Sequence, residues 1–212
     1  MNIRSKIQNY WGWFLGADKN SNKRYSWYVN RINDSIYLRE ILHSGYKKPQ
    51  LPGVDSQKIV YCIYDGKYHG GGLADRLRGI LSTYSVCKEL GVDFRLVFRH
   101  PFELDKYLVP NRYNWTDTGN ELRYDIPHDN ILILPSTQDS LYQKKKQHGW
   151  LKKHIKNCSN QIHVYTNASF AYENGYHELF NELFKPSQRL QDTITKQYEL
   201  LASGGDCPRT LI

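Results

Sequence analysis

HGGGLADRLRGI, at residues His69–Ile80, is the stretch that decides the fold. It follows a short apolar run, IVYCIY at Ile59–Tyr64, and opens a helical pattern that continues to about Leu90. This order indicates a strand, a glycine loop and a helix. Three consecutive glycines, Gly70–Gly72, allow positive φ angles and a close approach of the backbone to a ligand. The free N–H groups of the first helical turn then predict an anion site, although a tight strand-to-helix turn would use the same glycines.

Two arginines at the start of this helix strengthen the prediction of an anion site. Arg76 and Arg78 place positive charge where it opposes the helix dipole, which favours a bound anion nearby. If Leu77 faces the core, the two arginines lie roughly 100° to either side of it. We therefore expect only one of them to reach a ligand, and Arg76 is nearer the loop. The competing interpretation is a surface ion pair with Asp75 or Glu89.

Strands and helices alternate beyond the glycine loop. The helix from residue 73 to residue 90 has apolar side chains at helical spacing, and Gly91 is typical of its C-cap. The core-facing stripe is predicted to be Leu73, Leu77, Ile80, Leu81, Tyr84 and Cys87. Strands are predicted at 58–64, 93–98, 131–134 and 161–166, and further helices at 136–157, 175–184 and 187–201. The pattern predicts an α/β fold, a Rossmann-like parallel sheet with flanking helices.

Two segments carry a resemblance to a known family. GGGLADRLRGILSTYSVCKELG at 70–91 and DFRLVFRHPFELDKYLVPNRYNW at 93–115 resemble the N-terminal half of a bacterial glycosyltransferase group related to the fucosyltransferases. That group has a motif of the type G-G-L-G-N-[QR], which corresponds here to Gly71–Arg76. This chain departs from it at Ala74, where the family often has glycine, and at Asp75, where it often has asparagine. The resemblance implies the N-terminal half of a GT-B-type architecture, a GDP-sugar donor, no cofactor, and a glycan or polysaccharide acceptor.

The resemblance also implies where the donor is held. The donor-binding residues are predicted to be Gly70, Gly71, Gly72, Asp75 and Arg76. Because Asp75 is an acceptor-only carboxylate, it cannot donate to a phosphate oxygen and is expected to hold Arg76 or Arg78 instead. An Arg fork can bind a phosphate of the leaving diphosphate with two hydrogen bonds.

An inverting sugar transfer also needs a base for the acceptor hydroxyl. The candidate catalytic residues are His100, Glu103 and His69. Loops that follow parallel strands meet at one edge of the sheet, so His100 is expected to face the glycine loop. The alternative is that these histidines are ordinary surface residues. Since the chain has no Asp-x-Asp motif, we expect a metal-independent hexosyltransferase.

Composition sets the range of partners. The chain has 212 residues and a formal net charge of +8, which favours acidic partners such as nucleotides, anionic membranes or nucleic acid. Lysines concentrate at Lys144–Lys146 and Lys152–Lys153, and such runs are usually solvated faces. No nucleic-acid-binding motif is present, so a basic nucleic-acid or anion-binding module stays the alternative class. The four cysteines have no metal-site or disulfide spacing.

The domain organisation follows from these patterns. Residues 1–57 are predicted to be a basic and aromatic extension with a linker, 58–202 the Rossmann-like domain, and 203–212 a truncated tail. Residues 1–18 suit an amphipathic helix at a membrane surface or a helix packed on the domain. Without a signal or spanning segment, we expect a cytoplasmic protein, peripheral at the inner membrane face. Because the resemblance implies a second domain after residue 202, we expect a partial form, and an inactive half is the alternative.

Overall fold

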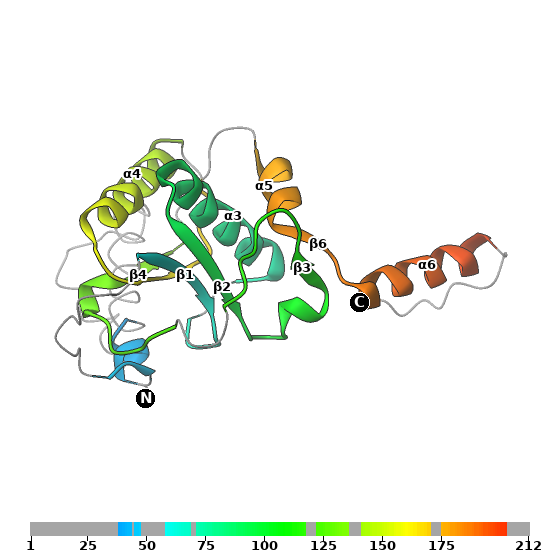
Figure 1. Ribbon diagram of the computed structural model, residues 1–212, viewed down its shortest axis with the longest axis horizontal. Helices are drawn as coiled ribbons and strands as arrows, with labels where there is room; N and C mark the ends of the chain where they lie inside the picture. Colours follow the sequence, from blue (N-terminus) through cyan, green and yellow to red (C-terminus); the bar gives the residue numbers. More distant parts are fainter. Residues whose placement is uncertain are drawn as a thin grey trace, which may run out of the picture.

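The computed structural model describes residues 38–43, 45–47, 58–68, 71–117, 122–135, 141–170 and 175–202 (Figure 1). Several predictions therefore lie outside the described residues. They concern residues 1–18, His69, Gly70 and the tail at 203–212. In the part of the chain that the structure describes, no helix combines the length and apolar character needed to cross a bilayer.

The centre of the fold is a four-stranded parallel sheet in the order β2-β1-β5-β4. Its strands are β1 (Ile59–Tyr64), β2 (Asp93–Phe98), β4 (Ile131–Leu134) and β5 (Ile162–Thr166). Cys62 in β1 is in register with Leu96 on one side and Val164 on the other. The structure thus confirms the predicted α/β class and the parallel pairing of the first two strands.

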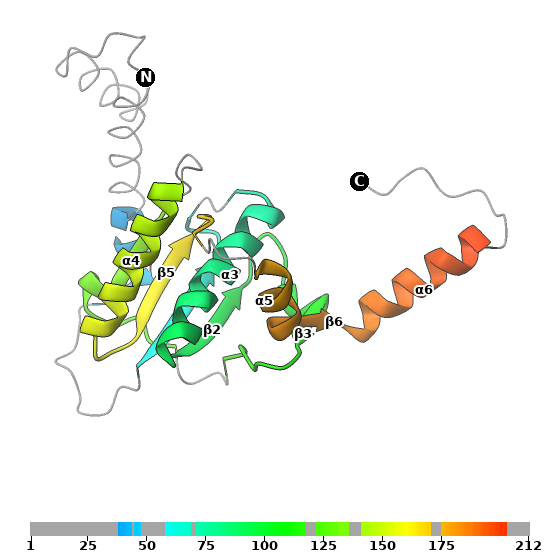
Figure 2. The same cartoon turned by 90° about the horizontal axis from the view of Figure 1, so that it is seen from above.

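Three helices lie on one face of this sheet (Figure 2). They are α3 (Leu73–Leu90), α4 (Leu141–Asn157) and α5 (Tyr176–Leu183). The crossover from β1 to β2 and the one from β4 to β5 move across the sheet in the same direction. Because such crossovers are right-handed, both place their helices on the same face. The main core forms there, between this helical layer and the strands.

The opposite face is covered by irregular segments and a short helical stretch. Ile41, from the helical residues 38–43, and Ile126, from the loop before β4, are buried against it. They pack on outward-alternating strand residues such as Tyr61, Ile63 and Tyr165. The sheet is therefore buried on both sides, as its almost continuously apolar strands predict.

The helix that follows the glycine loop buries a wider face than the predicted stripe. Ile80, Leu81, Tyr84 and Cys87 are buried as expected, but Leu73 is 45% exposed, so that part of the prediction is wrong. Leu73 is the first residue of α3, where the helix no longer has the sheet beneath it. The spacing of apolar residues predicts which side of a helix is buried, but not how far along the helix the sheet reaches. Gly91 caps the helix in the left-handed conformation with φ 62°, as predicted.

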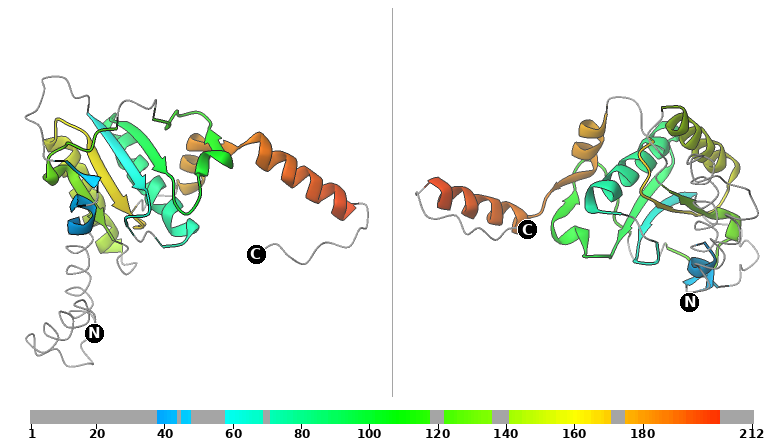
Figure 3. Two further views of the ribbon diagram at one scale, coloured as in Figure 1. Left: turned by 90° about the horizontal axis from the view of Figure 1, so that it is seen from below. Right: turned by 180° about the vertical axis from the view of Figure 1, so that it is seen from behind.

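Two short strands and a last helix complete the described chain. β3 (Leu108–Pro110) pairs antiparallel with β6 (Phe184–Pro186), and a single 3₁₀ turn, Leu104–Lys106, precedes β3. α6 (Gln188–Ala202) begins where the sequence predicts, because Ser187 Oγ accepts a hydrogen bond from Leu190 N–H at 3.3 Å. α6 extends away from the sheet and has no buried side chain (Figure 3).

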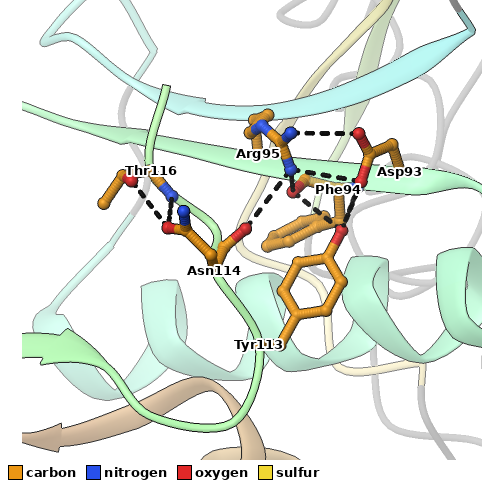
Figure 4. A network of polar contacts seen from close by, with 6 residues as sticks. All are labelled: Asp93, Phe94, Arg95, Tyr113, Asn114 and Thr116. Carbon is orange, nitrogen blue, oxygen red and sulfur yellow. Dashed lines mark hydrogen bonds and ion pairs between the residues drawn. The ribbon is translucent and has the colours of Figure 1, made fainter. Parts of the chain in front are cut away.

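Residues 111–117 run along the edge of β2 and are fixed by polar contacts (Figure 4). Tyr113 Oη accepts from Phe94 N–H at 2.7 Å and lies 2.9 Å from Asp93 Oδ1. Arg95 forms an ion pair with Asp93 and donates to the carbonyl of Asn114 at 3.3 Å. These contacts gather at the amino end of β2, whereas the glycine loop lies at the carboxyl end of β1.

Candidate functional site

The loops that follow β1 and β2 lie side by side at the carboxyl edge of the sheet. The N–H groups of Arg99 and His100 both donate to the carbonyl of Tyr64, at 2.8 and 3.1 Å. Gly66, with φ +91°, lies under the His100 ring, and a Cβ there would be 3.2 Å from the ring carbon Cγ. The predicted proximity of the two loops is therefore confirmed for the described residues.

Arg76 joins these two loops. Its side chain is buried, with only 7% exposed, although it carries a permanent charge. Nε donates to the carbonyl of Gly71 at 3.1 Å, and Nη1 donates to the carbonyl of His100. The guanidinium also lies over the rings of Tyr64 and Phe98, 5.8 and 5.7 Å from their centroids. One side chain thus fixes the distance between the glycine loop and the loop after β2.

The two arginines of the helix separate as helical geometry predicts. Arg76 points into the protein, whereas Arg78 is exposed and forms an ion pair with Asp75 at 3.2 Å. Two of the five N–H donors of Arg76 are engaged by carbonyls. Arg76 is therefore placed to position the loops, and only its remaining donors are available to a ligand.

Asp75 caps the start of α3. Its Oδ2 accepts from Gly72 N–H at 3.3 Å, and its Oδ1 accepts from Arg78 Nη1 at 3.2 Å. The expected pairing of Asp75 with an arginine is therefore observed with Arg78. A negative charge at this helix end is favourable with the dipole. Gly71 adopts φ +68°, and a Cβ there would lie 2.7 Å from Asp75 Oδ2, so this position of the loop requires glycine.

The candidate bases differ in their surroundings. His100 is exposed at the end of β2, with its ring against Gly66. Glu103 is exposed as well and forms an ion pair with Lys106 at 2.5 Å. The hydrogen bond from Lys106 lowers the pKa of Glu103, which makes this carboxylate a weaker base. Of the described candidates, His100 is better suited to accept a proton.

Arg99 also lies at this edge of the sheet, although it is not among the site residues predicted from the sequence. It is exposed between Phe98 and His100, and its guanidinium makes no hydrogen bond or ion pair with another described residue. The available signal was its place at the end of a parallel strand, directly before a candidate base. Asp65, at the end of β1, is a turn residue whose Oδ1 accepts from Lys67 N–H at 3.1 Å.

A pocket lies elsewhere, over the opposite face of the sheet. It has a volume of about 520 Å³ and is lined by Leu38, Arg39, Leu42, His43, Tyr46, Lys47 and His128. Tyr46 Oη is hydrogen-bonded to Nδ1 of the buried His163 at 2.5 Å, which connects the pocket wall to β5. None of the predicted site residues lines this pocket.

Comparison of the chain with models of known protein families gave no match, and comparison with curated proteins gave none either. Among the described residues, no group of three or more His, Cys, Asp and Glu side chains could hold a metal ion. The function is therefore inferred from the residues at the carboxyl edge of the sheet and from the geometry that joins them.

Proposed function

We propose that this chain is the N-terminal, Rossmann-like domain of a GT-B-type glycosyltransferase similar to the fucosyltransferases. It takes part in transfer of a sugar from a GDP-sugar to a glycan or polysaccharide acceptor. The observation that carries the proposal is the connection of the glycine loop to the loop after β2 through Arg76. Both loops lie at the carboxyl edge of a parallel sheet, which is where such folds bind their ligands.

The described residues suit different parts of the reaction. Arg99 is the exposed guanidinium that binds the diphosphate, because a planar fork matches two phosphate oxygens. Arg76 holds the loops in place and acts through them. His100 accepts the proton of the acceptor hydroxyl, whose oxygen attacks the anomeric carbon while the bond to the diphosphate breaks and GDP leaves. The developing charge on GDP is then stabilised by Arg99.

The test is thermal unfolding of the full chain with increasing GDP and GDP-fucose, compared with ADP and UDP at equal concentrations. A ligand that binds the folded state raises the unfolding midpoint in a concentration-dependent way. We expect a rise with the guanine nucleotides. Arg99→Ala should weaken their binding by about tenfold, the loss expected for a charged hydrogen bond.

Arg112→Ala is the matched control, because Arg112 is also exposed but precedes Tyr113, which contacts Asp93 at the other end of β2. It should leave GDP binding unchanged. An unchanged midpoint at millimolar GDP, or equal effects of the two arginine variants, would contradict the proposed donor site.

A further inference from the structure

The outer face of α4 is rich in lysine and carries no acidic residue. The helix sequence, LYQKKKQHGWLKKHIKN, contains six lysines and neither aspartate nor glutamate. Leu151 and Ile155 are buried and fix the inward side of the helix. At 100° per residue, Lys146 and Lys153 then lie on the side that faces away from the sheet.

Aromatic side chains lie among these lysines. Tyr142 is 71% exposed and Trp150 is 47% exposed, and both belong to the outward side of α4. We call Tyr142, Lys146, Trp150 and Lys153 the basic-aromatic face. The two rings lie on the same side of α4 as the exposed lysines, so an occupant of this face would meet cationic and aromatic groups together.

The charge of this face is not neutralised within the described part of the chain. Glu89 of α3 forms ion pairs with Lys152 and His148, which border the buried side of α4. Lys146 and Lys153 form no ion pair with another described residue. The basic-aromatic face therefore keeps its positive charge, and an occupant of complementary chemistry has to be anionic.

We propose that the basic-aromatic face of α4 docks on a membrane surface that contains anionic phospholipids. Lysines close to such a surface each add favourable electrostatic energy. Tyrosine and tryptophan prefer the headgroup region, where one part of the ring meets the apolar boundary and the other meets water. A helix of 17 residues is about 25 Å long and can lie flat along the surface.

Two observations favour a lipid surface over nucleic acid. α4 contains no arginine, the residue that best combines phosphate binding with stacking on bases. The ring of Trp150 is stacked on His154, with centroids 5.6 Å apart and planes at 27°, so one of its faces is already covered. Insertion of a ring edge at a lipid interface does not need that face, whereas stacking on successive bases uses the ring faces.

Docking through α4 would also orient the molecule. The N-terminal end of α4 follows β4, so it lies at the carboxyl edge of the sheet, as does the N-terminal end of α3. With α4 lying flat on the membrane, the carboxyl edge of the sheet is then held close to the membrane surface, at the N-terminal end of this helix. The proposal does not depend on transferase activity, because it concerns a different surface from the loops after β1 and β2.

The test is sedimentation of the full chain with phosphatidylcholine vesicles that contain or lack phosphatidylserine, at low and at physiological salt. We expect binding only to the phosphatidylserine vesicles. Lys146→Glu combined with Lys153→Glu should weaken this partitioning at least tenfold, and Trp150→Ala should weaken it several-fold. Because these side chains are exposed, the thermal midpoint of each variant should stay that of the wild type.

The matched control carries the same charge reversal elsewhere: Lys185→Glu combined with Lys196→Glu, two exposed lysines of β6 and α6. This control should bind vesicles like the wild type. The proposal is overturned if the wild type does not bind phosphatidylserine vesicles at low salt, or if the α4 variant binds as tightly as the wild type. It is also overturned if the control loses binding equally, or if single-stranded nucleic acid displaces the vesicles at equal phosphate concentration.

Discussion

At the scale of single residues, the position of Arg76 could be predicted more fully than its role. Its nearness to the loop and its separation from Arg78 follow from helical geometry. The sequence could not show that the carbonyls of Gly71 and His100 would occupy its donors, because one of them lies 24 residues away in the chain. Arg99 was missed for the opposite reason, since an exposed arginine after a strand has no distinctive local pattern.

Arg76→Lys tests the positioning role. A lysine ammonium cannot reproduce the fork that reaches both carbonyls, so the carbonyls of Gly71 and His100 are no longer held by one charged donor. We expect the free energy of unfolding to fall by about 1–3 kcal/mol, measured by urea denaturation. Arg78→Lys is the control, because Arg78 is exposed and its ion pair with Asp75 is worth little. Equal stability of Arg76→Lys and the wild type would argue against the role.

His163 gives a prediction about pH. It is fully buried in β5, and burial lowers its pKa to about 3, below the usual 6.5. Because the unfolded chain binds a proton near pH 6.5 and the folded chain does not, stability should fall as the pH drops from 6.5 towards 3. The contribution is at most about 1.4 kcal/mol per pH unit.

The measurement is urea denaturation of the wild type and of His163→Phe between pH 5 and pH 7. We expect the difference in unfolding free energy between the two proteins to change with pH, in favour of the wild type as the pH rises. Parallel pH profiles would show that His163 is protonated equally in the folded and unfolded chains. Tyr46 loses its hydrogen bond to Nδ1 of His163 in the variant at every pH, so the change of the stability difference with pH is the informative quantity.

At the scale of elements, local patterns were sufficient for most of the sheet and its helices. The bounds of α3 agree with the prediction because a glycine precedes it and Gly91 ends it. β3 and β6 were not predicted, since each has only three residues. Their pairing also joins segments far apart in the chain, such as Val109 with Lys185. Between β2 and β3 only a single 3₁₀ turn forms, at Leu104–Lys106.

Two helix glycines give a matched pair of predictions. A Cβ at Gly79 of α3 would lie 2.7 Å from Tyr64 Oη and 2.9 Å from the carbonyl of Thr166, whereas a Cβ at Gly149 of α4 would meet nothing within 4 Å. Gly79→Ala should therefore destabilise the protein by about 1–3 kcal/mol through overpacking. Gly149→Ala should stabilise it by up to about 1 kcal/mol, because alanine favours the helix. Thermal or urea unfolding measures both, and the same sign for both would contradict the packing of α3 on the sheet.

At the scale of the whole molecule, the strand order was not predictable from local patterns. β5, the last strand of the sheet, pairs with β1 and lies between β1 and β4. Such pairings depend on contacts between segments distant in the chain, and apolar alternation does not specify them. The covering of the second face by residues such as Ile41 and Ile126 was missed for the same reason.

α6 contributes little to the stability of the described domain. Ile194 and Leu201 are among its exposed apolar side chains, and none of its residues is buried. Ile194→Ala or Leu201→Ala should change the unfolding free energy by less than about 0.5 kcal/mol. Leu151→Ala in α4, at a fully buried position, should cost about 2–5 kcal/mol. A loss above about 1.5 kcal/mol for either α6 variant in urea denaturation would contradict the isolation of this helix.

The central claim is that a guanosine diphosphate group binds where the loops after β1 and β2 meet. Amide hydrogen exchange of the full chain, measured with and without GDP, tests it most directly. The account predicts slower exchange in Asp65–Tyr68, Gly71–Asp75 and Arg99–Glu103, with residues 111–117 unchanged. Protection confined to the pocket around Tyr46 and His128, or no protection at saturating GDP, would contradict it.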